Sequence, residues 1–383
     1  KRQSMHISSQ FDSGNIEVVS AQSPDDIRLT IPNDNQSEFA QWFHFRLVGE
    51  TFVTHTMTIG NLAKSAYPEG WKGYKVLASY DRQTWFRIPS EFDGDNLSFS
   101  LTLEQPSVYF AYFIPYSYER HLDLVHDAQM SLLCEHKFLG LTLDGRDMSL
   151  LVIGEETPEK KKVWITARQH PGETMAEWCA EGIIYRLLDE QDGLARQLLD
   201  NAVFYVVPNM NPDGNARGHL RTNAVGTNLN REWATPSVEK SPEVLYVLNA
   251  MSEIGVDMYL DLHGDEALPY NFVAGTEGNP SYTDNIKMLE NTFKDALLNA
   301  TPEFQDEFGY DKDEPGKANL TVASNAVGEK FKCMAYTVEM PFKDNADVPD
   351  DIYGWSVQRS RQLGEDLLIG VNAVVKKLKA AKQ

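Results

Sequence analysis

Hydrophobic and polar residues alternate in many short segments over the first 115 residues of the chain. Examples are "WFHFRLVG", "TFVTHTMTIG", "YKVLASY", "LSFSLTL" and "VYFAYF", with turn signals such as Pro68-Glu69-Gly70 and Asp93-Gly94-Asp95 between such segments. Alternation over a few residues is typical of a strand with one buried face, and many short strands at close spacing indicate an antiparallel sandwich. We predict an antiparallel β-sandwich domain over residues 1–117, with no helix in it.

The pattern changes at about residue 118, where fully apolar runs begin to alternate with segments of helical spacing. Predicted strands cover 163–168, 203–207, 257–262 and 334–338. Predicted helices cover "SYERHLDLVHDAQM", "GETMAEWCAEGIIYRLLDE", "SPEVLYVLNAMSEIG" and "YTDNIKMLENTFKDALLNA", and a terminal helix starts near Trp355. Strands are apolar on both sides when helices cover both faces of a sheet. Residues 118–383 are therefore predicted to form an α/β domain, a mixed and mostly parallel sheet flanked by helices.

Composition narrows the classes of partner and compartment. The chain has 383 residues, a length that agrees with two domains. Its net charge of −21 repels phosphate groups and therefore disfavours nucleic acid and anionic membranes as partners. No apolar run reaches the ~20 residues that cross a bilayer. The first fifteen residues lack the apolar segment of a secretory signal, and Cys134, Cys179 and Cys333 lack the spacing of a disulfide framework. We expect reduced thiols in a cytoplasmic protein.

Chemically capable side chains follow several of the predicted strands. His170 and Glu173 come after the strand at 163–168, His263 after the one at 257–262, and Glu339 after the one at 334–338. Ligands of α/β proteins bind at the carboxyl ends of strands. Two histidines and a glutamate are a usual ligand set for catalytic zinc, with a fourth position open to water. A His-x-x-Glu pair alone is more often a solvated turn, so the other strand ends carry the metal hypothesis.

Four motifs then reveal a family resemblance. "HPGE", "NPDGNARGHLRTNAVGTNLNREW", "DLHG" and "YTVEMPF" occur in this order, which resembles the zinc metallocarboxypeptidases. The chain is most similar to their cytosolic branch, which also carries an amino-terminal β-sandwich, and "AYFIPYSYERHLDLV" at the domain junction is similar to that branch too. The resemblance implies a carboxypeptidase-like fold for the second domain.

The resemblance also implies roles for seven residues. They are His170, Glu173 and His263 as ligands of one Zn²⁺ per chain, Glu339 as the base that activates water, Arg221 as the group that stabilises the oxyanion, and Asn230 and Arg231 as the pair that holds the substrate's terminal carboxylate.

General chemistry agrees with these roles. A metal lowers the pKa of bound water toward ~7, and a carboxylate that is not itself a ligand then accepts the proton. A guanidinium at the developing oxyanion is worth ~3 kcal/mol, and an arginine fork binds a free carboxylate in bidentate fashion. The sequence therefore predicts a zinc-dependent metallocarboxypeptidase that hydrolyses carboxy-terminal residues of peptides or proteins.

Several of these assignments have alternatives in the sequence. Glu339 is close to Lys343, which offers it an ion pair in place of a catalytic role. Arg217, Arg221 and Arg231 form either an anion site or a solvated basic loop. Asp213, followed by glycine, is interpreted as part of a tight turn without chemical function.

Two features depart from the wider family. The family commonly places a carboxylate two positions before the Asn-Arg pair, where it bonds a zinc-binding histidine, but this chain has Asn228 there. Asp261 and Asp265 are candidate substitutes. The digestive enzymes use a tyrosine from a mobile loop; three tyrosines, Tyr270, Tyr282 and Tyr310, lie in that interval. None of them is assigned to that role.

The substrate and the function class leave further alternatives. Members of the cytosolic branch are associated with acidic carboxy-terminal residues, so a preference for glutamate is one prediction, with Lys317, Lys330 and Lys332 as candidate cations or plain surface lysines. One rival function is a zinc-dependent N-acyl amino acid deacylase. Another is a catalytically silent binding protein whose sandwich recruits a partner.

Overall fold

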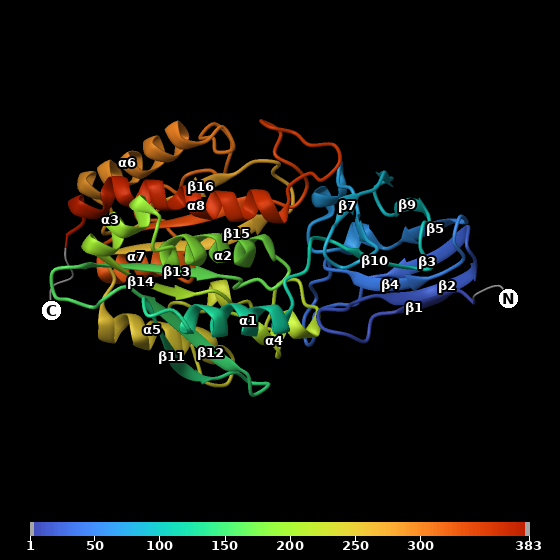
Figure 1. The fold of residues 1–383 in the computed structure, drawn as a ribbon, viewed down its shortest axis with the longest axis horizontal. Helices are drawn as coiled ribbons and strands as arrows, with labels where there is room; N and C mark the ends of the chain where they lie inside the picture. Colours follow the sequence, from blue (N-terminus) through green and yellow to red (C-terminus); the bar gives the residue numbers. More distant parts are fainter. Residues whose placement is uncertain (1–3, 380–383) are drawn as a thin grey trace.

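The alternating segments at the start of the chain form two five-stranded sheets that face each other. In the computed structural model, which describes residues 4–379, these sheets lie on the right of Figure 1. One has the order β1 (His6–Ser8), β4 (His44–Val48), β10 (Ser107–Ala111), β6 (Leu77–Ser79), β7 (Phe86–Arg87). The other has the order β2 (Glu17–Ser23), β3 (Asp26–Thr30), β5 (Thr54–Ile59), β9 (Leu97–Thr102), β8 (Ser90–Phe92).

Strand β5 illustrates why these segments are strands. His55, Met57 and Ile59 are buried in the sandwich, whereas the threonines between them point outward. The hydroxyl groups of Thr54 and Thr56 pair across to β9 at 2.7 and 2.8 Å. The period of two therefore separates the two faces of the sheet.

The predicted β-sandwich is confirmed, with two local differences. Strands β3 and β5 pair in parallel, whereas every other strand pair within the two sandwich sheets is antiparallel. Two short 3-10 helices, η1 (Leu62–Lys64) and η2 (Pro68–Trp71), occupy a stretch where no helix was predicted. Proline at the first helical position accounts for η2, because its φ is preset for a helix.

The second half of the described chain contains a seven-stranded sheet. Its order is β11 (Cys134–Leu141), β12 (Asp147–Ile153), β14 (Ala202–Val207), β13 (Lys161–Ala167), β15 (Met258–Asp265), β17 (Met334–Pro341), β16 (Phe272–Ala274). The four central strands run parallel, and the strands outside them pair antiparallel. This confirms the predicted mixed α/β sheet flanked by helices.

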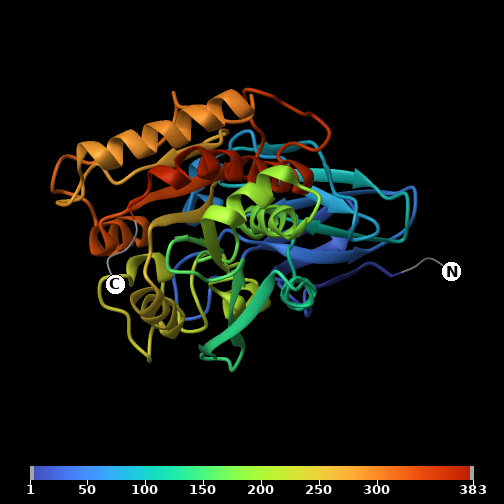
Figure 2. The same ribbon diagram turned by 60° about the vertical axis from the view of Figure 1, so that its left-hand side comes forward.

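Helices cover both faces of this sheet (Figures 1 and 2). They are α1 (Tyr118–Gln129), α2 (Met175–Leu188), α3 (Gly193–Asn201), α4 (Pro212–Arg217), α5 (Pro242–Ile254), α6 (Asp284–Ala300), α7 (Ala323–Phe331) and α8 (Val357–Val374), with short 3-10 helices η3 (Leu229–Arg231) and η4 (Val375–Lys377). Neighbouring side chains of β13 enter opposite cores: Val163 and Ile165 pack with α2 and α8, and Trp164 packs with α5 and α7. Both faces are thus apolar, as predicted.

The two halves of the molecule share one hydrophobic core. Tyr112 of the sandwich stacks on Phe342, just after β17, with ring centroids 4.8 Å apart. The buried guanidinium of Arg87 donates to the carbonyl oxygens of Phe342, Tyr353 and Trp355. Burial lowers the pKa of Arg87 to about 10, so it stays charged at neutral pH. The predicted boundary at residues 117 and 118 falls just before α1 and stays a prediction.

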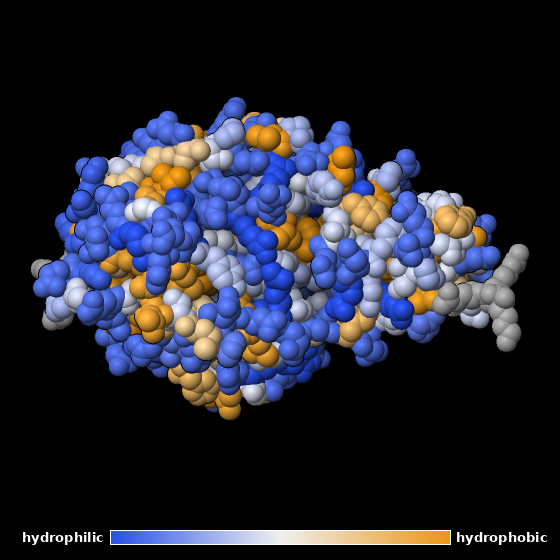
Figure 3. Space-filling view, viewed as in Figure 1, coloured by the Kyte–Doolittle hydropathy of each residue, from blue (hydrophilic) through white to orange (hydrophobic). Residues whose placement is uncertain are grey.

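The face drawn in Figure 3 is largely hydrophilic, with hydrophobic residues in separate groups. Within residues 4–379, no helix combines the length and the apolar character that crossing a bilayer requires.

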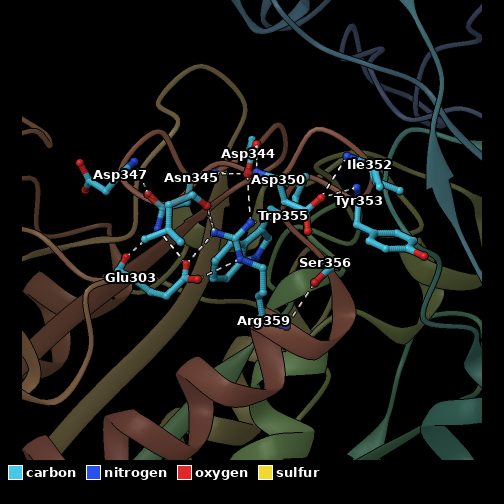
Figure 4. Close-up of polar contacts among 12 residues, drawn as sticks. Glu303, Asp344, Asn345, Asp347, Asp350, Ile352, Tyr353, Trp355, Ser356 and Arg359 are labelled. Atoms are coloured by element: carbon cyan, nitrogen blue, oxygen red, sulfur yellow. Dashed lines mark hydrogen bonds and ion pairs between the residues drawn. The ribbon is translucent and has the colours of Figure 1, made fainter.

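Arg359, near the start of α8, holds the loop that follows β17 (Figure 4). Its guanidinium donates to both carboxylate oxygens of Glu303, at 3.1 and 2.8 Å, and to Asp344 at 3.0 Å. It also donates to the carbonyl oxygens of Val348 and Gly354. A planar arginine head is suited to so many acceptors at once.

We predict that Arg359→Met lowers the free energy of unfolding by about 3 kcal/mol, because it leaves two carboxylates without their cation in a largely buried network. The Arg359 side chain is only 15% exposed. Urea denaturation measures the change. Arg28→Met is the matched control, since Arg28 is 66% exposed in its pair with Asp26, and we expect it to cost less than about 0.5 kcal/mol. Equal effects of the two substitutions would contradict the network.

Candidate active site

The turn after β13 is shaped by a buried arginine. Arg168 has a φ of 59°, a left-handed conformation that a non-glycine residue adopts only when its surroundings enforce it. Its guanidinium donates to the carbonyl oxygens of Tyr116 and Pro171 and to the side chains of Glu177 and Asn215. These four bonds hold the turn that carries the first two predicted metal ligands. Sequence analysis missed Arg168, because a buried arginine has no pattern of its own.

The three predicted metal ligands meet in space. The side-chain ligand atoms of His170, Glu173 and His263 all lie within 4.8 Å of one another, and the three residues are buried. Nδ1 of His170 is 2.7 Å from one carboxylate oxygen of Glu173, and Nδ1 of His263 is 3.0 Å from the other. Among residues 4–379, this is the one cluster of three such side chains.

The outer nitrogens of both imidazoles have their own acceptors. Nε2 of His170 donates to the amide oxygen of Asn228 at 2.9 Å, and Nε2 of His263 donates to Asp261. With the protons on Nε2, both Nδ1 lone pairs point at the Glu173 carboxylate. Lone pairs that face one another repel unless a cation lies between them. The donor set therefore fits a divalent metal ion.

Protonation equilibria agree in part with this fit. Burial, together with the nearby Arg221, lowers the pKa of His170 to about 4, so this imidazole is neutral at pH 7. Burial alone would raise the pKa of Glu173, but His170 and His263 bring it well below its usual range. Burial by itself would lower the pKa of His263. The neighbouring carboxylate of Asp261 outweighs this effect and raises the pKa of His263 well above its ordinary value. A dication among these atoms would favour the neutral imidazole.

The structure shows which groups bond the histidines when Asn228 replaces the carboxylate of the wider family. Asn228 occupies the position where the family has a carboxylate, and it still accepts the proton of His170. A carboxylate instead lies beside the other histidine, where Asp261 accepts from His263. Asp261 is held in place by hydrogen bonds from Thr166 and Gln169, at 2.7 and 2.6 Å. Asp265, the other suggested substitute, bonds Tyr310 instead.

All seven predicted site residues line one cavity of about 450 Å³. Glu339 lies on β17 directly opposite His263 of β15, and its Oε2 has no hydrogen-bond partner among residues 4–379. Burial and the nearby Glu173 raise the pKa of Glu339, while His263 opposes this. Lys343, the suggested ion-pair partner, donates to the carbonyl oxygen of Lys72 at 2.6 Å. Among residues 4–379, the suggested ion pair between Glu339 and Lys343 is not formed.

The three arginines of the 217–231 segment separate into two groups. Arg221 and Arg231 line the cavity, and Arg221 lies against the rings of Phe39 and Tyr67, 5.6 and 5.5 Å from their centroids. Arg217 instead forms an ion pair with Asp144 at 2.7 Å.

Asn230 is fixed by its amide oxygen. That oxygen accepts from the backbone N–H of Ala323 at 2.9 Å and from Gln169 at 3.2 Å. The amide NH₂ group is therefore the part of Asn230 left to face a ligand. Arg231 donates to the carbonyl oxygen of Asn230 at 2.8 Å, which joins the pair.

One minor prediction needs correction, and one alternative is resolved. Asp213, interpreted as a turn residue, belongs to α4 and is fully buried, where it accepts from Thr142, Arg146 and the backbone of Asp144. Lys317, Lys330 and Lys332 are exposed and are not among the described residues that line the cavity, which agrees with the alternative of plain surface lysines. The lysines on the cavity wall are Lys294 and Lys312, which come from other segments. A residue that is close to Glu339 in sequence need not be close to it in space.

Sequence analysis missed several residues of the cavity wall. They are Tyr67, Glu266, Lys294 and Lys312, which contribute side chains beside the predicted set, and Tyr310, which was considered but not assigned. Glu266 follows His263 by three residues, so its position after the same strand was a usable signal. Tyr67 comes from the sandwich, and nothing local in its segment indicates a role at a distant site.

Comparisons with known proteins agree with this arrangement. Residues 118–362 match the family model described as zinc carboxypeptidase, and residues 7–113 match the cytosolic carboxypeptidase N-terminal domain.

Individual relatives are similar over nearly the whole chain. A crystal structure of a metallo-carboxypeptidase from Burkholderia cenocepacia is 49% identical, with a TM-score of 0.96 over 98% of this chain and 100% of that one. A metallo-carboxypeptidase from Pseudomonas aeruginosa is 47% identical, also with a TM-score of 0.96 and the same coverage. Cytosolic carboxypeptidase 6 of Caenorhabditis elegans is 27% identical over 87% of this chain and 77% of its own length. The chain therefore belongs to the zinc carboxypeptidase family of metallocarboxypeptidases, and it carries the amino-terminal domain of the cytosolic branch.

Proposed function

We propose that this protein removes single residues from the carboxy termini of peptides or proteins, with one Zn²⁺ per chain bound by His170, Glu173 and His263. One observation carries the proposal: the three side chains bring their ligand atoms within 4.8 Å, on the wall of a cavity that also holds Glu339. The cavity wall contains cationic groups for a free carboxylate as well.

Four side chains of the cavity wall would each have a separate task in the reaction. Arg231 and the amide of Asn230 bind the terminal carboxylate of the substrate, which selects the last peptide bond. A zinc ion held by His170, Glu173 and His263 would act as a Lewis acid and lower the pKa of a water molecule toward ~7. Glu339 accepts the proton of the attacking water and passes it to the leaving amine. Arg221 donates to the oxygen on which negative charge develops.

The partly buried position of Arg221 strengthens this last role. Its guanidinium is held against two aromatic rings, so little side-chain freedom remains to be lost in the transition state.

A cytoplasmic location, and the absence of nucleic acid and membrane partners, stay predictions from composition.

A deacylase remains the nearest rival chemistry, since it also recognises a free carboxylate. Family membership supports the peptidase. Cleavage of a short peptide compared with cleavage of acetyl-aspartate separates the two.

We predict that a chelator abolishes peptide cleavage and that added Zn²⁺ restores it. Glu339→Gln should keep zinc and lose turnover by about 10²- to 10⁴-fold, because glutamine cannot accept the proton. Mass spectrometry of digests measures turnover, and elemental analysis measures zinc.

Glu266→Gln is the matched control, because Glu266 is also buried at the cavity wall and also has an oxygen without a partner. We expect this variant to retain zinc and most of its turnover. The base assignment is wrong if Glu339→Gln stays fully active, or if Glu266→Gln is the inactive variant.

The preference for a terminal glutamate also stays a prediction. Of the lysines on the cavity wall, Lys294 has a side chain only 15% exposed and pairs with Asp306 at 3.1 Å. A glutamate side chain of the substrate would compete with Asp306 for this cation.

We predict that a peptide ending in glutamate is cleaved better than one ending in leucine, and that Lys294→Met lowers kcat/KM for the glutamate peptide by about tenfold. The leucine peptide should change by less than about twofold. Lys330→Met is the control, since Lys330 bonds Ser252 away from the cavity wall. An equal loss with both peptides would show that Lys294 does not recognise the side chain.

A further inference from the structure

The loop that carries Arg221 has little structure of its own. It runs between α4 and η3, and we call residues 218–226 the arginine loop. The backbone N–H groups of Leu220, Arg221 and Thr222 belong to Arg221 and its two neighbours in this loop. Buried N–H groups need acceptors, and here the acceptor comes from far away in the sequence.

A single carboxylate of the sandwich accepts all three amides. Asp34 Oδ1 accepts from the backbone N–H of Leu220 at 2.7 Å, and Oδ2 accepts from those of Arg221 and Thr222 at 2.9 Å each. The Thr222 hydroxyl donates to the same Oδ2 at 3.0 Å. Asp34 is 4% exposed. Four hydrogen bonds to one carboxylate in a buried setting form a strong and directional attachment.

The same turn of the sandwich also contacts the arginine side chain. Residues 34–39 form this turn, which we call the clamp turn, and the backbone N–H of Asp34 donates to the carbonyl oxygen of Phe39. Phe39 lies against one side of the Arg221 guanidinium, and Tyr67 of the sandwich contacts it as well. Backbone and side chain of Arg221 are thus both held by the sandwich.

Further contacts join the two segments. The backbone N–H of Asn35 donates to Nε2 of His219, whose Nδ1 donates to the carbonyl oxygen of Thr222. At Gly226, where φ is 80°, an added Cβ would lie 2.3 Å from the carbonyl oxygen of Gln36. The clamp turn and the arginine loop are therefore fitted closely, without room for an ordinary side chain.

We propose that Asp34 is a positioning residue for Arg221, so that the amino-terminal sandwich completes the catalytic apparatus of the second domain. Asp34 lines no part of the cavity and acts only through the arginine loop. This inference rests on the role of Arg221 in the proposed function. It gives the sandwich a part in transition-state stabilisation.

The test uses the full-length zinc-loaded protein and the variant Asp34→Asn. The side-chain NH₂ of asparagine cannot accept the donors that now bond Oδ2. We expect kcat to fall by about 10- to 100-fold, with KM within about twofold and zinc content unchanged, because a displaced guanidinium weakens the transition state more than the ground state. Asp93→Asn is the matched control, since Asp93 accepts backbone N–H groups only within its own exposed turn. We expect it to leave kcat and KM unchanged.

A double-mutant cycle separates positioning from general stability. In an Arg221→Ala background, Asp34→Asn should lower kcat by less than about twofold, because the group that it positions is already gone. The same 10- to 100-fold loss in that background would overturn the proposal. Thr222→Val is the milder variant if Asp34→Asn does not fold. It removes one of the four bonds, and its smaller loss of kcat should also disappear in the Arg221→Ala background; a loss that persists there overturns the proposal.

Hydrogen exchange supplies a readout that does not depend on turnover. Amides of residues 220–222 should exchange slowly in the unmodified protein and markedly faster in Asp34→Asn, while those of α2 stay unchanged. Unchanged exchange in the arginine loop would overturn the proposal. If the unmodified protein cleaves no carboxy terminus, the proposed function fails, but the exchange result still decides whether Asp34 holds the loop.

Discussion

The meeting of two imidazole nitrogens and one carboxylate at the edge of the parallel sheet is the constraint on which the rest of the site depends. With the imidazole protons on Nε2, their lone pairs point at one another inside the protein, an arrangement that is unfavourable without a cation. The fold sustains it through neighbours that leave each side chain one orientation. Arg168 shapes the turn of His170 and Glu173, and Asp261 orients His263.

The parallel strands explain why such distant residues converge. In register, Ala167 of β13 pairs with Leu262 of β15, and His263 pairs with Glu339 of β17. The carboxyl ends of all three strands therefore lie at one edge of the sheet, where backbone N–H groups and turns are free to bind ligands. The proposed base and one proposed metal ligand lie on adjacent strands, at a spacing that the ladder itself sets.

The sandwich is joined to this edge by polar as well as apolar contacts. Tyr112 stacks on Phe342 directly after the strand that carries Glu339, and Arg87 donates to carbonyl oxygens of the same region. Asp34 attaches the loop of Arg221. The two segments of the second domain that flank the cavity thus each depend on a charged side chain of the first. Buried charges with several partners favour this placement of the sandwich against the seven-stranded sheet, because a shifted placement would leave charges unpaired.

The sequence by itself determined the parts whose signals are local. Alternation with a period of two predicted the sandwich strands, apolar runs predicted the parallel sheet, and motif order predicted which residues gather at the site. The tertiary structure decided everything that depends on partners far away in the chain. It alone supplied Asp34 under the arginine loop, decided between Asp261 and Asp265 as the partner of His263, and placed lysines on the cavity wall that the sequence had not suggested. The reason is physical: a buried polar group is defined by the partner that satisfies it, and that partner is chosen by the packing of whole sheets and not by neighbouring residues.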